Sequence, residues 1–206
     1  PPFPHQRQIV VVQEFIPPPT FGGYLFVTVD RGKGVTISTR VRDGGDEMPA
    51  FSPTTLPDNL LLHVLTYIAT PAEPETRPFL DWAYAAGIRV LLPVSREDGL
   101  LDWAVANNTR DENTGLHGMP EPTGELLGPI AINSVDLIIV PASAVDRRGV
   151  RMGWGMGYYD KTLGSMERRP PVYALVYDEE VVDELPREIH DQPVTGVVTP
   201  AAITTF

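Results

Sequence analysis

The sequence contains no cysteine and no long apolar run. The absence of thiols excludes disulfide scaffolds, zinc sites built on thiolates and cysteine nucleophiles. No apolar run reaches the roughly 18 residues of a membrane span, and the opening PPFPHQRQ lacks the pattern of a signal peptide. We therefore expect a cytoplasmic protein that does not bind a membrane.

Basic residues are also scarce, 16 against 27 acidic residues, which leaves a net charge of -11. A chain of that charge repels phosphate backbones, so binding to nucleic acid is not expected. One segment differs from the rest. Residues 147–161 hold a single acidic residue and four basic ones: Arg147, Arg148, Arg151 and Lys161. Any anionic ligand is expected to bind there.

Length and composition are those of an ordinary globular protein, with 206 residues and 42% hydrophobic residues. We predict a single α/β domain over residues 1–206, in which residues 60–206 carry the motifs and residues 1–60 are an atypical N-terminal part. Alternating patterns over residues 24–30 and 35–41 predict a hairpin. The proline-rich stretch from residue 48 to 59 is predicted to be a loop.

Beyond residue 60, apolar runs alternate with helical patterns. A helix is predicted from Thr76 and Pro78 to a stop at Gly87, and a short one over about residues 158–166. Residues 107–134 read as a long connection. Buried strands are predicted at residues 60–69, 88–94, 135–142, 172–178 and 194–200. Such alternation predicts a three-layer sandwich, in which a mainly parallel sheet is flanked by helices and binds its ligand at the C-terminal ends of the strands.

The strongest chemical signal is the segment RMGWGMGYYD, residues 151–160. Its alternating glycines let the backbone approach a ligand closely, and successive N–H groups form an anion-binding concavity. Arg151 and Lys161 add positive charge, and Asp160 offers a carboxylate to Mg²⁺. The competing interpretation is a tight glycine turn that packs against the sheet.

This segment matches neither of two common phosphate loops. The P-loop requires Gly-Lys-Ser/Thr, and the dinucleotide fingerprint requires GxGxxG followed by an acidic residue at the end of a second strand. Asp178 ends a predicted strand at nearly the right distance. A nicotinamide-dependent oxidoreductase of the Rossmann type therefore remains an alternative.

Residues 141–160, PASAVDRRGVRMGWGMGYYD, closely resemble the signature of the 5-formyltetrahydrofolate cyclo-ligase (methenyltetrahydrofolate synthetase) family. Four further motifs of that family follow the same order along the chain. They are TYIATPAEPET (66–76), RVLLPV (89–94), GMPEPTG (118–124) and VDELPREIHDQPVTGVVTP (182–200). The resemblance spans residues 67–200.

The resemblance implies a set of site residues. The nucleotide-binding residues would be Arg151, Met152, Gly153, Trp154, Gly155, Met156, Gly157, Tyr158 and Tyr159. The substrate-binding residues would be Ile68, Glu73, Trp154, Gly155, Met156, Gly157 and Tyr158. Arg151 and Tyr158 would be catalytic. Asp160 would bind the metal ion together with an acid from residues 178–180, taken here as Glu179.

The resemblance also implies the activity. The protein would cyclise 5-formyltetrahydrofolate to 5,10-methenyltetrahydrofolate with ATP and Mg²⁺, releasing ADP and phosphate, as a monomer or weak homo-oligomer. Two departures from the family pattern leave an alternative open. Residues 1–60 show no basic helix, and Trp154 and Met156 stand where some relatives have cations. The alternative is a catalytically weak or silent relative that binds folate or nucleotide.

Other polar residues receive structural interpretations. Glu121 is predicted to be a turn carboxylate, and His190 and Asp191 part of the wall of the site. His63 and His117 have no partner at metal-ligand spacing, so the sequence predicts no metal site on histidine.

Overall fold

The computed structural model describes the backbone of most of the chain. The described residues are 8–13, 23–30, 34–41, 63–85, 87–106 and 112–206. Side chains are described from residue 63 onward, except that of Trp82. The loop predicted over residues 48–59 lies outside the described residues.

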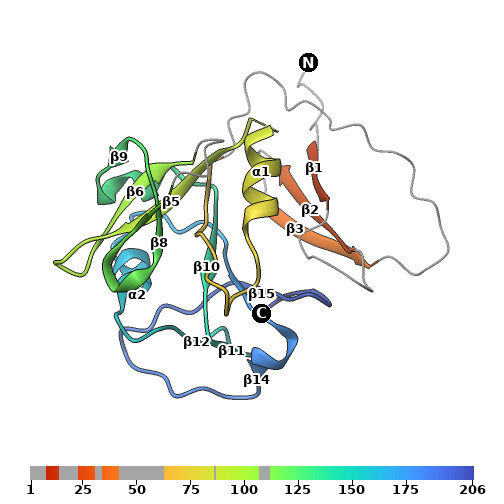
Figure 1. Ribbon diagram of the computed structural model, residues 1–206. Helices are drawn as coiled ribbons and strands as arrows, with labels where there is room; N and C mark the ends of the chain where they lie inside the picture. The colour runs from red at the N-terminus through yellow and green to blue at the C-terminus, as the bar shows by residue number, and fades with distance from the viewer. Residues whose placement is uncertain (1–7, 14–22, 31–33, 42–62, 86, 107–111) are drawn as a thin grey trace.

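The centre of the protein is an eight-stranded mixed sheet (Figure 1). Its strands are β4 (His63–Leu65), β5 (Arg89–Ser95), β6 (Leu101–Val105), β9 (Leu126–Leu127), β10 (Leu137–Pro141), β13 (Val172–Leu175), β15 (Gly196–Val198) and β16 (Ile203–Thr205). They lie in the order β16-β15-β13-β10-β4-β5-β6-β9. Every pairing from β15 to β5 is parallel, and the outer pairings are antiparallel. The predicted parallel centre is thus confirmed.

The predicted helical layers are not confirmed. The described residues contain two α-helices, α1 (Arg77–Ala85) and α2 (Tyr158–Gly164). The long connection after β6 holds short pieces instead: β7 (Glu112–Thr114), η1 (Leu116–Gly118), β8 (Pro120–Pro122) and η2 (Pro129–Ser134). Proline in these pieces lacks an N–H donor, and glycine favours non-helical backbone, so no crossover helix forms there. Neither α-helix in the described part of the chain has the length and apolar character of a membrane span.

The helix predicted to stop at Gly87 does so. Gly87 adopts a left-handed φ of +72°. Its N–H donates to the Tyr84 carbonyl at 3.0 Å, and the Ile88 N–H donates to the Ala83 carbonyl at 2.9 Å. These two bonds satisfy carbonyls at the end of α1, which then packs Phe79 and Ala83 into the core.

The first predicted core strand is shorter than its apolar run. Strand β4 ends at Leu65, although residues 66–69 remain buried. The hydroxyl of Thr76 accepts the Ala69 N–H at 3.0 Å and donates to the Tyr67 carbonyl at 2.8 Å. A side chain thus replaces a neighbouring strand as the partner of this backbone, and the segment turns away from the sheet toward the site.

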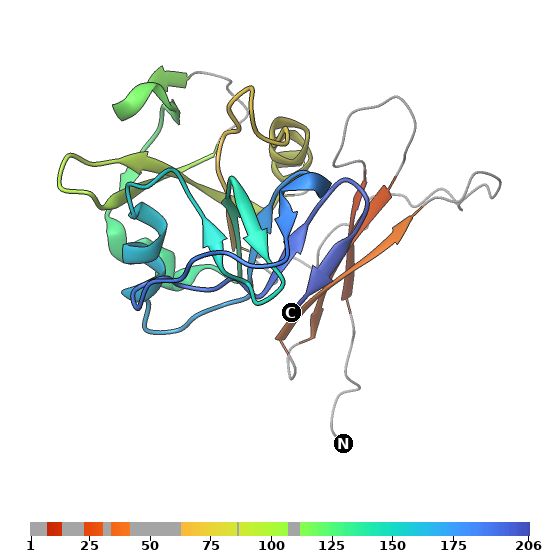
Figure 2. The ribbon, with the colours of Figure 1, turned by 90° about the horizontal axis from the view of Figure 1, so that it is seen from below.

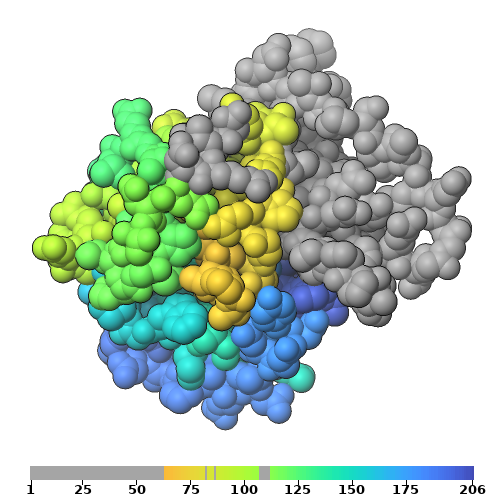
Figure 3. Space-filling view, in the orientation of Figure 1, coloured from red at the N-terminus to blue at the C-terminus, as the bar shows by residue number. Residues whose placement is uncertain are grey.

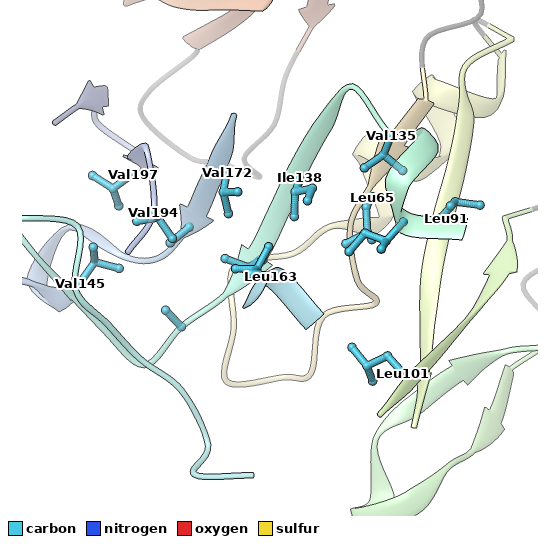
Figure 4. Packing of buried hydrophobic residues seen from close by; sticks show 14 of the residues in the cluster. Leu65, Leu91, Leu101, Val135, Ile138, Val145, Leu163, Val172, Val194 and Val197 are labelled. Carbon is cyan, nitrogen blue, oxygen red and sulfur yellow. The ribbon is translucent and has the colours of Figure 1, made fainter. Parts of the chain in front are cut away.

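Both faces of the sheet are buried, as successive strand residues point to opposite sides. Leu137 and Ile139 pack on the face covered by α1. Ile138 and Val140 pack on the other face, with Leu163 of α2 (Figure 4). Burial on both sides explains why the central strands read as continuous apolar runs.

The N-terminal part forms a separate antiparallel sheet of β1 (Gln8–Gln13), β2 (Gly23–Asp30) and β3 (Gly34–Val41). The pairing of Asp30 with Gly34 confirms the predicted hairpin. Strand β3 approaches the edge strand β16 (Figure 2). The assignment of residues 1–206 to a single domain stays a prediction.

Candidate functional site

A cavity of about 680 Å³ opens at the C-terminal ends of the parallel strands. Pro93 and Ser95 of β5, Pro141 of β10 and the segment after β4 form its base. Figure 3 shows the surfaces near residues 66–75, 112–122 and 150–160, in gold, green and cyan, meeting on one face. This position confirms the prediction of a cleft at this edge of the sheet.

The glycine-rich loop forms one wall of the cavity. The hairpin of β11 (Ala144–Asp146) and β12 (Arg151–Met152) leads into it. The buried carboxylate of Asp146 holds this hairpin, because it accepts the N–H groups of Arg148 at 2.8 Å, Val150 at 2.9 Å and Leu185 at 3.1 Å. Burial by itself raises the pKa of Asp146, but these bonds and the Arg148 guanidinium outweigh it and lower the pKa below its usual value.

The loop requires glycine at two positions. Gly155 and Gly157 have left-handed φ angles of +84° and +68°. Residues 151–160 all line the cavity. Trp154 is 63% exposed, and Met156 is also exposed. The loop therefore borders the cavity rather than packing against the sheet, and α2 begins directly after it at Tyr158.

Most of the positive charge near the loop is already paired. Three arginines have carboxylate partners: Arg147 with Asp183, Arg148 with Asp146 and Glu184, and Arg151 with Asp160. Lys161 instead donates to the Gly99 carbonyl at 3.4 Å. Of the four predicted cations, Arg151 alone lines the cavity among the described residues.

Arg151 is held from several sides. Its side chain is 4% exposed, and its Nη2 donates to Asp160 Oδ2 at 2.9 Å. Its guanidinium carbon lies 5.7 Å from the centroid of the Tyr159 ring. The Arg151 Nε has no partner among the described residues. The loop therefore presents a fixed guanidinium at the cavity.

The two tyrosines after the loop tie distant segments together. The Tyr158 hydroxyl donates to the Arg96 carbonyl at 3.0 Å, and its ring meets that of His117 at a centroid distance of 6.5 Å. His117 adopts a left-handed φ of +62°, which is uncommon for a residue other than glycine. Burial raises the pKa of Tyr159, a rise that Arg151 opposes and Glu73 increases.

The other predicted site residues lie at different distances from the cavity. Ile68 lines it, whereas Glu73 and Glu179 are not among the lining residues. Glu73 is buried, and its Oε2 accepts the N–H and the hydroxyl of Thr70 at 2.8 and 2.9 Å. Glu179 is exposed on the 3₁₀ turn η3 (Asp178–Glu180). Glu179 thus does not reach the cavity that Asp160 lines.

Several cavity residues were not predicted to belong to the site, namely Tyr67, Leu101, His117, Met119, Glu121 and Glu188. Glu121 was expected to be a turn carboxylate, but it is buried and accepts the Ser95 N–H at 2.7 Å. The GMPEPTG motif pointed to this segment without assigning a role to its glutamate. His190 and Asp191 line the cavity, as expected of wall residues.

Two aspartates of the cavity wall, Asp160 and Asp191, are the candidate ligands of a metal ion. The described residues contain no group of three or more metal-ligating side chains. Asp160 Oδ1 accepts the Gln192 N–H at 3.2 Å, and Asp191 Oδ2 accepts the Glu188 N–H at 2.7 Å. Mg²⁺ is commonly held by one or two carboxylates together with phosphate oxygens, so two aspartates in the cavity wall would be enough for such a site.

Known proteins are similar to this chain in sequence and in fold. A 5-formyltetrahydrofolate cyclo-ligase of Mycolicibacterium smegmatis is 39% identical over 142 residues, which cover 66% of this chain and 73% of that protein. The protein of the same name from Escherichia coli K12 is 29% identical over 155 residues, covering 72% and 84%. The solved structure of Aquifex aeolicus 5,10-methenyltetrahydrofolate synthetase has a TM-score of 0.57 at 27% identity, over 70% of this chain and 71% of that one.

The model of the 5-formyltetrahydrofolate cyclo-ligase family matches residues 62–200. This region contains the parallel strands, the glycine-rich loop and the residues that line the cavity. The match covers more than half of the sequence and agrees with the likeness in fold. The chain therefore belongs to the 5-formyltetrahydrofolate cyclo-ligase family.

Proposed function

We propose that this protein converts 5-formyltetrahydrofolate and ATP to 5,10-methenyltetrahydrofolate, ADP and phosphate. The observation that carries the proposal is the family match, which spans every wall of a cavity of about 680 Å³. A cavity of that volume accommodates a ligand of cofactor size. The nicotinamide alternative loses its support, because membership of this family accounts for the glycine pattern.

The chemistry needs activation of a poor leaving group. In the proposed reaction, the formyl oxygen on N5 attacks the γ-phosphorus of ATP, and the bond to ADP breaks. N10 of the folate then attacks the activated carbon, the ring closes, N10 loses its proton and phosphate leaves. No protein nucleophile takes part, so catalysis consists of positioning and charge stabilisation.

The loop would hold the phosphates and one face of the folate. Arg151 is the proposed phosphate-binding and catalytic cation, and the N–H groups of residues 152–159 would surround the phosphate oxygens. Tyr158, the second proposed catalytic residue, would lie beside the γ-phosphoryl group as it is transferred. Ile68 would contact the pterin, and Glu73 would accept from a pterin N–H through Oε1, the oxygen that has no partner.

Mg²⁺, when bound, would neutralise the charge that develops on the phosphates. Asp160 is the proposed carboxylate ligand. For the second ligand, the sequence predicts Glu179, but Asp191 lines the cavity and Glu179 does not. Position therefore favours Asp191, and the two assignments are separated by the magnesium titration described in the Discussion.

The decisive experiment is a spectroscopic assay with the complete chain. Addition of MgATP to protein and 5-formyltetrahydrofolate should produce the absorbance of the methenyl product together with one equivalent of ADP. A non-hydrolysable ATP analogue should give no product. Equal product formation with the analogue would contradict the phosphorylation step.

The second candidate is a relative that binds these ligands without turnover. The exposed side chains of Trp154 and Met156 on the loop favour it, since they bring no positive charge to the phosphates. Strands β1 to β3 occupy described parts of the region where the family has a basic helix. Binding of both ligands by calorimetry without ADP release would support this candidate.

We further propose a cytoplasmic location and a monomer or weak homo-oligomer.

A further inference from the structure

Several buried polar atoms of the described residues lack a partner, and two of them belong to Tyr67 and Glu73. The hydroxyl oxygen of Tyr67 and the Oε1 of Glu73 are both closed to water, and neither has a hydrogen-bond partner among the described residues. Burying a polar group without a hydrogen bond costs free energy, so such atoms are uncommon in native proteins. The segment from Thr66 to Glu73 holds three of them, since Thr66 Oγ1 is also unpartnered, which indicates a missing partner.

The ring of Tyr67 belongs to the cavity wall. Tyr67 is 3% exposed and lines the cavity beside Ile68. The Thr76 hydroxyl fixes its backbone by accepting from Ala69 and donating to the Tyr67 carbonyl. Because the backbone is held, the hydroxyl has few alternative positions. The missing partner is therefore either a ligand that enters the cavity or a buried water, and the test below separates the two.

The two atoms differ in chemistry. Burial raises the pKa of the Tyr67 phenol well above its usual value, and the negative charge of Glu73 raises it further. Tyr67 thus keeps its proton and can donate. Glu73 has one oxygen committed to Thr70, so its Oε1 remains as an acceptor. Tyr67, which lines the cavity, thus supplies a donor, and Glu73, buried behind the cavity wall, supplies an acceptor.

We infer that the Tyr67 hydroxyl donates a hydrogen bond to the carbonyl oxygen at position 4 of the pterin and thereby determines specificity for a 4-oxo ring. This inference rests on the proposed function. In a 4-oxo pterin the N3–H donor stands next to the O4 acceptor, so one edge of the ring offers a complementary group to each of the two atoms, the Tyr67 donor and the Glu73 acceptor. A ligand without the carbonyl would leave the Tyr67 hydroxyl buried and unpaired.

The test is a cycle of one side-chain change and one ligand change. Binding of 5-formyltetrahydrofolate and of its 4-deoxy analogue is measured by calorimetry for the wild type and for Tyr67→Phe. The wild type should prefer the 4-oxo ligand more strongly than Tyr67→Phe does, by about tenfold, the value of one hydrogen bond. Loss of N3–H in the analogue affects both proteins alike and cancels in the cycle.

Tyr84→Phe is the matched control, because this tyrosine is exposed on α1 and is not among the residues that line the cavity. Its preference for the 4-oxo ligand should equal that of the wild type. Thermal unfolding gives a second readout. Tyr67→Phe should be at least as stable as the wild type, since it removes an unpaired buried hydroxyl.

If Tyr67→Phe prefers the 4-oxo ligand as strongly as the wild type does, the inference is overturned. If Tyr67→Phe is also less stable than the wild type, the partner of the hydroxyl is a buried water. In both cases the wild type still binds 5-formyltetrahydrofolate. A wild type that binds neither ligand would instead contradict the proposed function itself. The two failures are therefore distinguishable in one set of titrations.

Discussion

Arg151 Nη2 and Asp160 Oδ2 lie 2.9 Å apart and close the glycine-rich loop at its two ends. The loop between them contributes its backbone to the cavity wall, and the pair holds that backbone in place. Because the guanidinium is already paired, an incoming phosphate must share it with Asp160. A metal ion on Asp160 would release the guanidinium for that purpose, which links the two proposed roles.

Asp160→Asn should destabilise the fold. The substitution leaves the buried Arg151 without a counter-charge, and we expect a loss of about 2 kcal/mol in the free energy of unfolding. Urea denaturation measures it. Asp183→Asn is the control, because the pair of Asp183 with Arg147 is exposed and contributes little. Equal stability of the two variants would show that the Arg151 pair does not hold the loop.

Asp160→Asn should also raise the half-saturating Mg²⁺ concentration of the reaction, and excess Mg²⁺ should restore part of the rate. Asparagine keeps the shape of the side chain but removes its charge. A Mg²⁺ titration of the rate measures the effect. Asp191→Asn should raise the half-saturating Mg²⁺ concentration in the same way, whereas Glu179→Gln should leave it at the wild-type value. A shift with Glu179→Gln alone would restore the assignment made from sequence.

Gly153→Ala should weaken ATP binding about tenfold. A Cβ at Gly153 would lie 2.7 Å from Arg151 Nη1 and push the guanidinium away from its position. Gly128→Ala provides the control, because no atom lies within 4 Å of the added carbon. Calorimetric titration with ATP compares the variants. Wild-type affinity in Gly153→Ala would remove Arg151 from the phosphate site.

Gly115→Ala should displace Glu121 from the Ser95 N–H. The added Cβ would overlap the Glu121 carboxylate, although the Gly115 backbone itself (φ -79°) accepts alanine. We expect a loss of about 2 kcal/mol in the free energy of unfolding. In a double-mutant cycle with Glu121→Ala, the cost of Gly115→Ala should largely disappear. Additive losses would mean that the two residues do not interact.

Asp146 should contribute to the acid sensitivity of the fold. Its pKa is lower in the folded protein than in the unfolded chain, so its contribution is complete above the unfolded value of about 4 and falls as the pH drops through the folded value. Asp146→Asn should lower stability at pH 7 and flatten the dependence on pH below about 4. Urea denaturation across this range measures both. If the free energy of unfolding falls with pH equally in the wild type and in Asp146→Asn, Asp146 is not a source of the acid sensitivity.

The sequence by itself determined the parallel centre, the stop of α1 at Gly87, the hairpin of β2 and β3, and the loop over residues 151–160. These features depend on neighbours in the chain, namely apolar runs, turn residues and closely spaced glycines. The family resemblance likewise rests on motifs that are continuous in sequence. Such signals are readable before any contact is known.

Only the tertiary structure decided which side chains meet. Four basic residues near the loop predicted an anion site, but three of them are paired with carboxylates. Asp183 and Glu184 come from a distant segment to Arg147 and Arg148, whereas Arg151 pairs with Asp160 of the loop itself. Whether Asp191 or Glu179 reaches the cavity depends on how the last connections cross the sheet. The buried hydroxyl of Tyr67 was hidden in an apolar run, because hydropathy records how a residue is buried and not whether its polar atom finds a partner.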